Sequence, residues 1–472
     1  MKTKSMIFGV AAIASSMLMA ADTPEVESVV MSQAQFGRTV TVTYKLKNAP
    51  AVVTFDVETN TLADASGEWV SIGGEAVCNA KGAVWRKVTE ADADSEVKYT
   101  ITWRPDLSWE GHKVSLTDGG ARAVVTAWAL DNTPDYMVVD LAAANTVRYY
   151  PAVDFLPGSE MGQEGAVTNN PSYKTSKLLM RKIMASGVEW TMGSASGETQ
   201  RTDAREAPHV VSLTNNYYIG VYEITQEQWA NIAGRARAAY YVTDGAMRPM
   251  EKVTYNEIRL LVDAEGHQNT TSGMGATEED IANYSWPKDP NPKSYLGLLR
   301  AKTGLDFDLP SEAQWEFAAR AGYGSGFWGD GSVINNANSD DNLSKLSRYK
   351  ANSPNDATET WNSYLLTPAE GGTDIVGSHK PNAWGLYDVY GNIYEWCLDW
   401  FVESISNNEG KININPNSPS SPLSSTSTKR VIRGGSWGHY ASDCRPAFRN
   451  GLPPTDCHSI LGFRVVCTAG LK

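Results

Sequence analysis

The sequence predicts an α+β protein in which an antiparallel β-sandwich precedes an irregular domain with little regular secondary structure. Three observations support this fold class. Apolar and polar residues alternate over the first third of the chain, capping pairs mark short helices further on, and from about Leu178 the chain is rich in Trp, Tyr and Gly. Because 472 residues exceed what one hydrophobic core usually organises, we expect at least two domains.

Residues 1–20 have the layout of a secretory signal peptide. Lys2 and Lys4 precede an apolar run over residues 6–19, and Ala20 and Ala21 follow it. The run falls short of the roughly 18 uninterrupted apolar residues that a spanning helix needs, and no other stretch reaches that length. We therefore expect a secreted or periplasmic protein with no integral membrane segment in its mature form.

The charge of the chain narrows the class of partner. Its formal net charge is −13, and it becomes more negative when the two lysines of the predicted signal peptide are removed. An acidic balance disfavours nucleic acid as a partner and is compatible with cation binding. The expected partner is an exported protein or a glycan ligand.

Residues 21–155 are expected to form an immunoglobulin-like antiparallel β-sandwich. The alternating apolar positions are Val40, Val42, Tyr44 and Leu46 in one run and Val97, Tyr99, Ile101 and Trp103 in another. No cluster of chemically active side chains stands out there, so we interpret this domain as a spacer or adhesive module. Residues 156–176 are polar, rich in Gly and without a period, which is typical of a linker.

Residues 177–472 form the second predicted domain, and three helix starts can be placed in it. At each start a Thr or Ser is followed three residues later by Gln or Glu, the spacing of a capping box. The pairs are Thr225 with Gln228, Thr254 with Glu257, and Ser311 with Gln314.

The helix after Ser311 is expected to have one buried face and one exposed face. Trp315, Ala318 and Ala319 recur at helical spacing and predict the buried face. The remaining positions, Glu312, Glu316 and Arg320, are expected to be exposed to solvent.

Five motifs of the second domain together resemble the formylglycine-generating enzyme family, also called sulfatase-modifying factors. In chain order they are Tyr217–Trp229, Asp308–Arg320, Asn382–Trp396, Arg433–Trp437 and Leu461–Arg464. The resemblance implies an irregular fold related to C-type lectins and held by loops, calcium and buried aromatic residues. It also implies an oxidoreductase that uses Cu(I) and oxygen to convert a substrate cysteine to an aldehyde.

A calcium loop is implied by the match of residues 388–395 to the family. In that match Asp388 and Glu395 supply side-chain ligands, and Gly391 and Ile393 supply main-chain ligands. Carboxylate and carbonyl oxygens are the donors that structural Ca²⁺ prefers. The alternative is that Asp388 forms a turn and Glu395 pairs with an arginine.

The candidate catalytic residues are Ser436, His439 and Cys444. The family's copper enzymes carry two cysteines, three and eight positions after the serine of a Gly-Gly-Ser motif, and His439 and Cys444 occupy those positions here. Imidazole and thiolate both bind copper, so Cu⁺ is a candidate cofactor, although the cysteine pair is incomplete. In the alternative, Cys444 is structural, either packed as a thiol or joined in a disulfide to Cys397, with Cys457 and Cys467 as competing partners.

Four arginines gather in the closing motifs, namely Arg433, Arg445, Arg449 and Arg464. They could line a groove for an acidic or peptide ligand through bidentate contacts. The alternative is that they neutralise internal acidic groups and stack on buried rings.

Two functions follow from the sequence, and whether the protein is an enzyme is left open. The first is an exported sulfatase-modifying-factor-like oxidoreductase that acts on an exported polypeptide. The alternative is a non-catalytic, calcium-stabilised binding module that recognises a glycan or protein through exposed Trp and Tyr residues. A third interpretation is an interaction scaffold for envelope assembly.

Overall fold

The structure is a computed structural model that describes residues 23–34, 37–60, 66–94, 98–109, 120–142, 146–158, 167, 170–202, 204–234, 236, 239, 244–260, 278–353, 372–405, 413–414 and 428–469. The predicted signal peptide, residues 1–20, lies outside this range. Within the described residues, no helix is both long enough and apolar enough to cross a bilayer.

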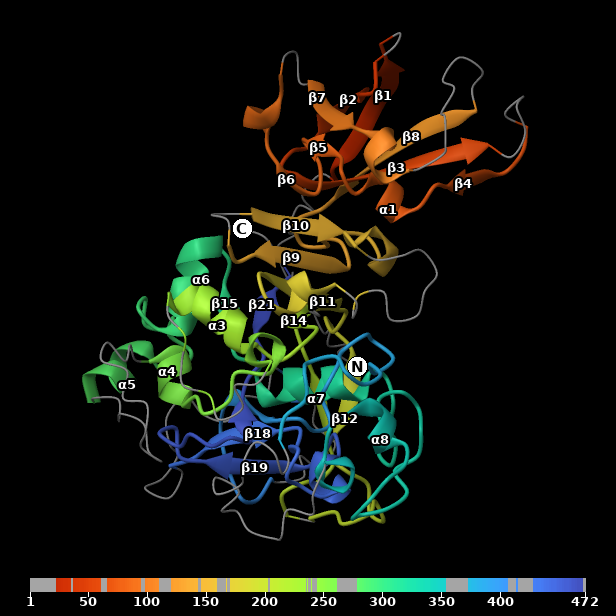
Figure 1. The fold of residues 1–472 in the computed structure, drawn as a ribbon. Coiled ribbons are helices and arrows are strands. Elements are labelled where there is room, and N and C mark those ends of the chain that lie inside the picture. Colours follow the sequence, from red (N-terminus) through yellow and green to blue (C-terminus); the bar gives the residue numbers. More distant parts are fainter. Residues whose placement is uncertain are drawn as a thin grey trace, which may run out of the picture.

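The N-terminal part consists of two antiparallel sheets, drawn in red and orange in Figure 1. One sheet has the order β1-β2-β7-β5, and the other has β3 between β4 and β6 and also paired with β8. The strands are β1 (Glu25–Gln33), β2 (Val40–Lys47), β3 (Ala51–Asn60), β4 (Trp69–Ser71), β5 (Lys81–Gly82), β6 (Arg86–Val88), β7 (Lys98–Trp103) and β8 (Ala121–Trp128), with short helices α1 (Gly74–Val77), η1 (Glu90–Asp92) and α2 (Pro105–Ser108).

The alternation predicted for this part is confirmed where the strands are described. Val40, Val42, Tyr44 and Leu46 of β2 are at most 3% exposed, and the residues between them face outward. On β7, Tyr99, Ile101 and Trp103 are completely buried. The period of two follows from side chains pointing alternately to the two faces of a strand.

A six-stranded sheet connects the N-terminal part to the rest of the molecule, with the order β10-β9-β11-β14-β21-β15. Figure 1 shows its β9–β10 hairpin between the two ends of the molecule. The strands are β9 (Tyr136–Asp140), β10 (Thr146–Tyr150), β11 (Lys177–Ile183), β14 (Tyr217–Gly220), β15 (Phe307–Asp308) and β21 (Val466–Thr468), with turns η2 (Val153–Phe155) and η3 (Pro171–Lys174). The hairpin falls within the predicted sandwich range but pairs with β11, so hydrogen bonds tie the two parts together.

The C-terminal part adds two small sheets, β12-β13-β17 and β19-β18-β16-β20, and short helices. Its strands are β12 (Glu189–Met192), β13 (His209–Ser212), β16 (Tyr394–Trp400), β17 (Asn413–Ile414), β18 (Arg430–Arg433), β19 (Arg449–Leu452) and β20 (Leu461–Gly462). Its helices are α3 (Gln226–Ala233), η4 (Gly245–Met247), α4 (Tyr255–Arg259), α5 (Glu278–Tyr284), α6 (Tyr295–Thr303), α7 (Glu312–Arg320), α8 (Leu343–Leu346), η5 (Lys350–Asn352) and η7 (Ala441–Cys444). Most of this part is loop, as the Gly- and Trp-rich composition predicts.

All three predicted capping boxes are confirmed. Thr225, Thr254 and Ser311 each accept a hydrogen bond from the backbone N–H three residues on, and each third residue reaches back to the cap. These contacts satisfy N–H groups that the first turn of a helix leaves unpaired. They begin α3, α4 and α7.

The prediction of an exposed face on α7 is wrong. Trp315, Ala318 and Ala319 are buried as expected, but Glu312, Glu316 and Arg320 are also at most 5% exposed. The charges on this helix are paired inside the molecule, so helical periodicity alone could not distinguish them from solvated charges.

The fold is thus a mixed α and β arrangement with many antiparallel sheets and few helices. Buried residues of the two parts share hydrophobic clusters. Val52 of β3, for example, belongs to the same cluster as Met137 of β9 and Tyr218 of β14. The finer assignments, an immunoglobulin-like sandwich and a relation to C-type lectins, stay predictions.

Candidate functional site

The loop from Asp388 to Glu395 is tightly turned and fully enclosed. Asp388, Gly391 and Asn392 all have positive φ, at 59°, 158° and 62°. A side chain at Gly391 could not be accommodated, because its Cβ would lie 2.2 Å from the carbonyl oxygen of Arg348. The loop is therefore held against the Ser347–Arg348 backbone and leads directly into β16.

Glu395 is held by an arginine. The guanidinium of Arg464 donates to both oxygens of Glu395 at 2.6–2.8 Å, and the indole N–H of Trp315 donates to Oε2 at 2.7 Å. Both charged side chains are completely buried. This is the arginine pairing that the sequence offered as the alternative for Glu395.

Asp388 is only partly satisfied. Its Oδ2 accepts from the Gly377 N–H at 2.6 Å, while its Oδ1 is buried without a hydrogen-bond partner among the described residues. Burial raises the pKa of Asp388 above its ordinary value, although the Gly377 amide and the charges of His379 and Arg464 oppose this rise. A bound cation or a proton would stabilise this buried carboxyl oxygen, Oδ1, in place of the missing hydrogen bond.

Glu223 is a third acidic residue at this loop that the sequence analysis missed. It accepts hydrogen bonds from the Asn392 side chain at 2.6 Å and from the Ile393 N–H at 3.2 Å. Burial and the neighbouring carboxylates of Asp388 and Glu395 raise the pKa of Glu223 well above its ordinary value. Glu223 follows β14 closely in the chain, and nothing in the sequence signals that it packs against a loop 170 residues away.

The predicted calcium ligands fit the ion only in part. Asp388 has an oxygen to offer, but Glu395 uses both oxygens on Arg464 and Trp315. Among the described residues, no three His, Cys, Asp or Glu side chains converge as a metal site requires. The calcium assignment stays a prediction, and the geometry of Glu395 favours the alternative.

Ser436 and His439 are brought together. Ser436 Oγ lies 2.6 Å from His439 Nδ1 and accepts a hydrogen bond from the Gly438 N–H. The His439 ring packs edge-on against Tyr394, with 4.8 Å between ring centres. Burial and the charge of Lys350 lower the pKa of His439 to about 4, so the imidazole is neutral at physiological pH.

Cys444 packs against the same loop as a protonated thiol. It is completely buried at the end of η7, and its Sγ would lie 2.5 Å from a Cβ at Gly435. Burial, with Asp443 nearby, raises the pKa of the Cys444 thiol well above its ordinary value. Because thiolate is the form that binds copper and attacks substrates, this environment disfavours both roles.

Tyr394 is a second residue that the sequence analysis missed. Its hydroxyl is buried without a hydrogen-bond partner among the described residues. Burial raises the pKa of Tyr394 well above its ordinary value, and Asp443 and Cys444 contribute to the rise. It belongs to the Asn382–Trp396 motif, where an unusual density of aromatic residues was the available signal.

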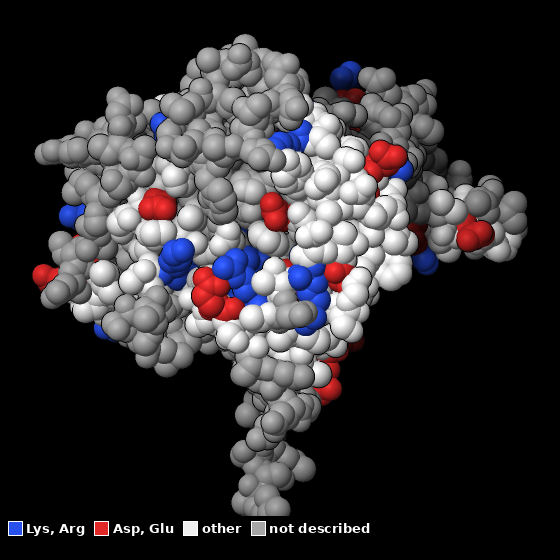
Figure 2. Space-filling model, turned by 90° about the horizontal axis from the view of Figure 1, so that it is seen from below, with Lys and Arg blue, Asp and Glu red and all other residues white. Residues whose placement is uncertain are grey.

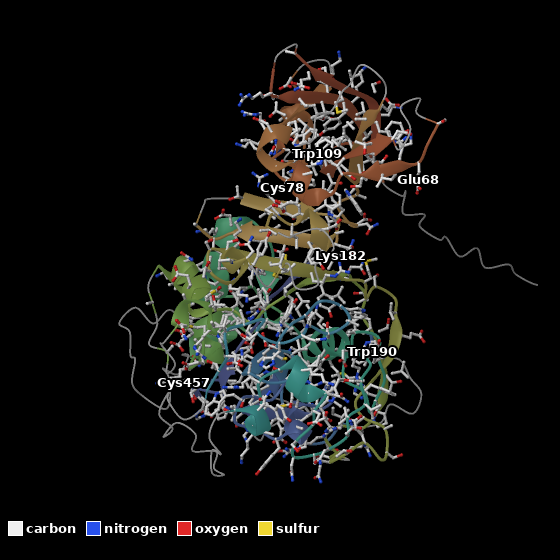
Figure 3. All side chains as sticks on the ribbon, turned by 45° about the vertical axis from the view of Figure 1, so that its right-hand side comes forward. Glu68, Cys78, Trp109, Lys182, Trp190 and Cys457 are labelled. Carbon is white, nitrogen blue, oxygen red and sulfur yellow. The ribbon has the colours of Figure 1, made fainter. Side chains whose placement is uncertain are left out.

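No disulfide joins any two of the five cysteines. Cys397 and Cys444 are both buried but are not joined, so of the two structural alternatives for Cys444 the packed thiol is observed. Figure 3 shows Cys78 and Cys457 in different parts of the molecule.

The four arginines of the closing motifs neutralise internal acids, as the second interpretation expected. Arg433 pairs with Glu316, Arg449 with Glu312 and Arg445 with Glu206 and Glu198, in addition to the Arg464–Glu395 pair. None of the arginines is more than 2% exposed. They are therefore not available to line a groove.

Three exposed apolar side chains of the C-terminal part lie in the loop that follows α7, and the other large ones among the described residues are Met184, Val188 and Ile281. Tyr323, Phe327 and Val333 are 39%, 40% and 49% exposed. Phe327 and Val333 face each other in an isolated β-bridge, and Gly331 lies against the Tyr323 ring. We call Tyr323, Phe327 and Val333 the α7-loop patch.

On the face shown in Figure 2, basic and acidic side chains lie beside one another among uncharged residues.

Comparison with known proteins identifies the family. A sulfatase-modifying factor enzyme 1-like domain matches residues 171–469. Curated relatives include a formylglycine-generating enzyme from Streptomyces coelicolor (27% identical over 321 residues, 61% of this chain and 90% of the relative) and the chaperone protein LppX from Paenibacillus barcinonensis (26%, 53% and 80%). Serine/threonine-protein kinase pkn1 from Chlamydia pneumoniae is 25% identical over 62% of this chain, a match that spans only 38% of that relative.

Solved structures that match this chain include Treponema denticola variable protein 1, with a TM-score of 0.45 and 24% identity over 62% of this chain and 95% of that one. Another is PvdO from Pseudomonas aeruginosa, with a TM-score of 0.41 and 22% identity over 61% and 94%. The names of the curated relatives denote an enzyme, a chaperone and a kinase, so the family by itself does not assign an activity. The family match covers more than half of the chain, and the protein therefore belongs to the sulfatase-modifying factor enzyme 1-like family.

Proposed function

We propose that this protein is a binding member of its family that recognises an exported polypeptide without oxidising it. The observation that carries the proposal is the α7-loop patch. Two aromatic rings and one aliphatic side chain are exposed within a single loop, whereas Met184, Val188 and Ile281, the other exposed large apolar residues of the described C-terminal part, carry no aromatic ring and lie elsewhere in the chain. Exposed aromatic clusters of this kind mark interaction sites.

The patch is anchored on packed residues, which favours binding. The patch follows α7, in which every residue except Gln314 is buried, and a Cβ at Gly322 would lie 3.9 Å from the half-buried ring of Trp384. Trp384 in turn packs on Phe317 of α7, with 5.2 Å between ring centres. A preorganised apolar surface loses little conformational entropy on association. The aliphatic Val333 beside the rings suits apolar side chains of a polypeptide.

The donor set near Cys444 supports binding over copper oxidation. A thiol with a raised pKa and an imidazole hydrogen-bonded to Ser436 make a weaker Cu(I) site than the pair of thiolates that soft copper prefers. The prediction that the chain is exported, and that its ligand is an exported polypeptide, rests on the signal-peptide layout of residues 1–20.

The test uses an unfolded, reduced and alkylated secretory protein as the polypeptide probe. We expect the wild-type protein to bind the probe in fluorescence anisotropy, and Tyr323→Ser combined with Phe327→Ser to weaken binding at least tenfold. Leu107→Ser is the matched control, because Leu107 is 66% exposed but lies in the N-terminal part. Equal affinity in the double variant, or binding only to a glycan array, would refute the polypeptide assignment.

An oxidoreductase that acts on an exported polypeptide is the second candidate. One observation favours it: His439 is neutral, and neutral imidazole is the form that ligates metals. Copper bound at about one ion per chain under reducing conditions, lost in both His439→Ala and Cys444→Ala and accompanied by aldehyde formation on a cysteine peptide, would establish this function in place of the first.

A further inference from the structure

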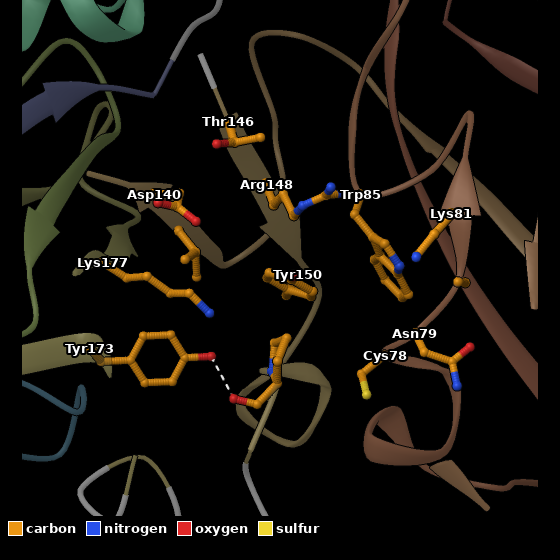
Figure 4. A pocket seen from close by; sticks show the side chains of 13 residues that line it. Cys78, Asn79, Lys81, Trp85, Asp140, Thr146, Arg148, Tyr150, Tyr173 and Lys177 are labelled. Atoms are coloured by element: carbon orange, nitrogen blue, oxygen red, sulfur yellow. Dashed lines mark hydrogen bonds between the residues drawn. The ribbon is translucent and has the colours of Figure 1, made fainter. Parts of the chain in front are cut away.

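A cavity of about 260 Å³ lies where the N-terminal sheets meet the six-stranded sheet. Lys81 and Trp85 reach it from the N-terminal part, and Thr146, Arg148 and Tyr150 reach it from β10 (Figure 4). The volume suits a small ligand, since pockets for drug-sized molecules start at about 300 Å³. The α7-loop patch contributes no residue to this cavity.

The cavity carries positive charge in an acidic protein. Lys81, Arg148 and Lys177 line it, against one carboxylate, Asp140. Asp140 already accepts a hydrogen bond from the Ala142 N–H at 2.9 Å. Among the described residues, neither Lys81 nor Arg148 lies within ion-pair distance of a carboxylate. A local excess of cations in a chain of net charge −13 points to an anionic ligand.

Two polar atoms in the cavity wall lack partners. Trp85 is 1% exposed, and its indole N–H finds no hydrogen-bond acceptor among the described residues. The same is true of the Thr146 hydroxyl. Both residues line the cavity, and buried polar groups are nearly always paired in native proteins, so two unpaired groups in its wall favour a ligand there.

The wall is preorganised. Trp85 stacks on Tyr150 with 5.2 Å between ring centres and 29° between their planes, which fixes the indole. Figure 4 shows the side chains of Lys81 and Arg148 extending toward Trp85. Cys78 also lines the cavity, but burial raises the pKa of its thiol to about 11, so it is a neutral wall atom and not a nucleophile.

We propose that this cavity binds a small organic anion through a carboxylate or phosphate group. The oxygens of that group accept hydrogen bonds from Trp85 and charge-assisted hydrogen bonds from Lys81 and Arg148, while the stacked Trp85 and Tyr150 rings contact the ligand body. This site goes beyond the proposed polypeptide function and does not depend on it. Because its walls come from both parts of the chain, a bound anion would fix their relative position.

The test is isothermal titration calorimetry of the full chain with inorganic phosphate and with D-glucuronate, and with D-glucose as the neutral control. We expect one of the anions to bind and glucose not to. Arg148→Gln and Lys81→Gln should each weaken binding about tenfold or more, because each removes a charge-assisted hydrogen bond. Lys45→Gln is the matched control, since Lys45 is an exposed lysine on β2 outside the cavity.

Trp85→Phe separates binding from folding. It keeps the stacked ring but removes an N–H that has no partner in the described structure, so the free protein should keep its melting temperature while anion affinity falls about tenfold. Circular dichroism checks the fold of each variant, and Lys81→Gln, at an exposed position, remains interpretable if Arg148→Gln unfolds.

Three outcomes would overturn the proposal: binding of neither anion, equal binding of glucose, or unchanged affinity in both Lys81→Gln and Trp85→Phe. Binding of phosphate alone or of glucuronate alone would support it and identify the anionic group. The Tyr323→Ser/Phe327→Ser variant should bind the anion like wild type, so failure of the polypeptide proposal is distinguishable from failure of this one.

Discussion

Single residues determine the chemistry of the candidate site, and Glu395 is the clearest case. Its carboxylate meets Arg464 in a buried bidentate pair, with Trp315 as a third partner. A buried pair of this kind is a weak source of net stability, but removing one member leaves the other charged and unsolvated. The loop therefore depends on both residues being present.

We predict that Arg464→Met lowers the free energy of unfolding by about 3–5 kcal/mol, because it leaves Glu395 buried without its partner. Arg122→Met is the matched control. Arg122 pairs with Glu58 on the surface at 2.6 Å, and such pairs contribute about 0–1 kcal/mol. Urea denaturation measures both. Similar losses in the two variants would contradict the interior role of Arg464.

The same pair leads to a prediction about calcium. Because Arg464 already neutralises Glu395, we expect EDTA to leave the melting temperature of the purified protein unchanged. Differential scanning calorimetry with EDTA, and then with added Ca²⁺, measures this. A fall on chelation that Ca²⁺ restores, and that Asp388→Ala abolishes, would establish the calcium loop against this expectation.

At the scale of secondary-structure elements, α7 is the element on which the site is built. It is a nine-residue helix that begins with a capping box. Its Trp315 contacts Glu395, its Glu316 pairs with Arg433 and its Glu312 pairs with Arg449. Since β16, β18 and β19 supply those partners, α7 is anchored to three strands of one sheet.

Acid stability should depend on the contact between α7 and β19. Burial by itself raises the pKa of Glu312, but Arg449 and Arg433 outweigh burial and hold it below its ordinary value of 4.5. A carboxyl whose pKa is depressed on folding stabilises the protein above its unfolded pKa. That contribution is lost as the pH falls below about 4.5.

We therefore expect Arg449→Met to lower the unfolding free energy at neutral pH, and the gap to wild type to narrow below pH 4.5 as Glu312 becomes protonated. Urea denaturation across the acid range measures the gap. Arg205→Met is the control, because Arg205 pairs with the exposed Glu403. A gap that does not depend on pH would show that Glu312 is not the group responsible.

At the scale of the whole molecule, the β9–β10 hairpin joins the two parts. It pairs with β11 through β9, and its Val139 and Tyr149 belong to the large buried cluster of the C-terminal part. The family match begins only at residue 171 and so leaves this hairpin out. The structural unit is larger than the region of sequence similarity.

We predict that a fragment of residues 131–472 melts cooperatively at a higher temperature than a fragment of residues 171–472. The shorter fragment exposes the edge of β11 and the apolar residues that the hairpin covers, and exposed edges promote association. Calorimetry and light scattering compare the two. Equal melting temperatures and equal monomer fractions would show that the hairpin belongs to the N-terminal part alone.

The sequence by itself determined the local features of this protein. Alternation placed β2 and β7, capping boxes placed α3, α4 and α7, and ordered motifs identified the family, because these signals depend on residues close together in the chain. It was wrong about the exposed face of α7, and it could not choose between a metal ligand and an ion pair for Glu395.

Only the tertiary structure decided those points, since they depend on partners far away in sequence. Glu312 is buried because Arg449 meets it across 137 residues, and Glu395 is occupied because Arg464 lies 69 residues further on. The cavity beside Trp85, whose indole N–H has no partner among the described residues, also depends on contacts between residues far apart in sequence. Its walls come from segments that no local sequence signal brings together. Burial, side-chain pKa values and solvent access at these sites are therefore set by tertiary packing and not by composition.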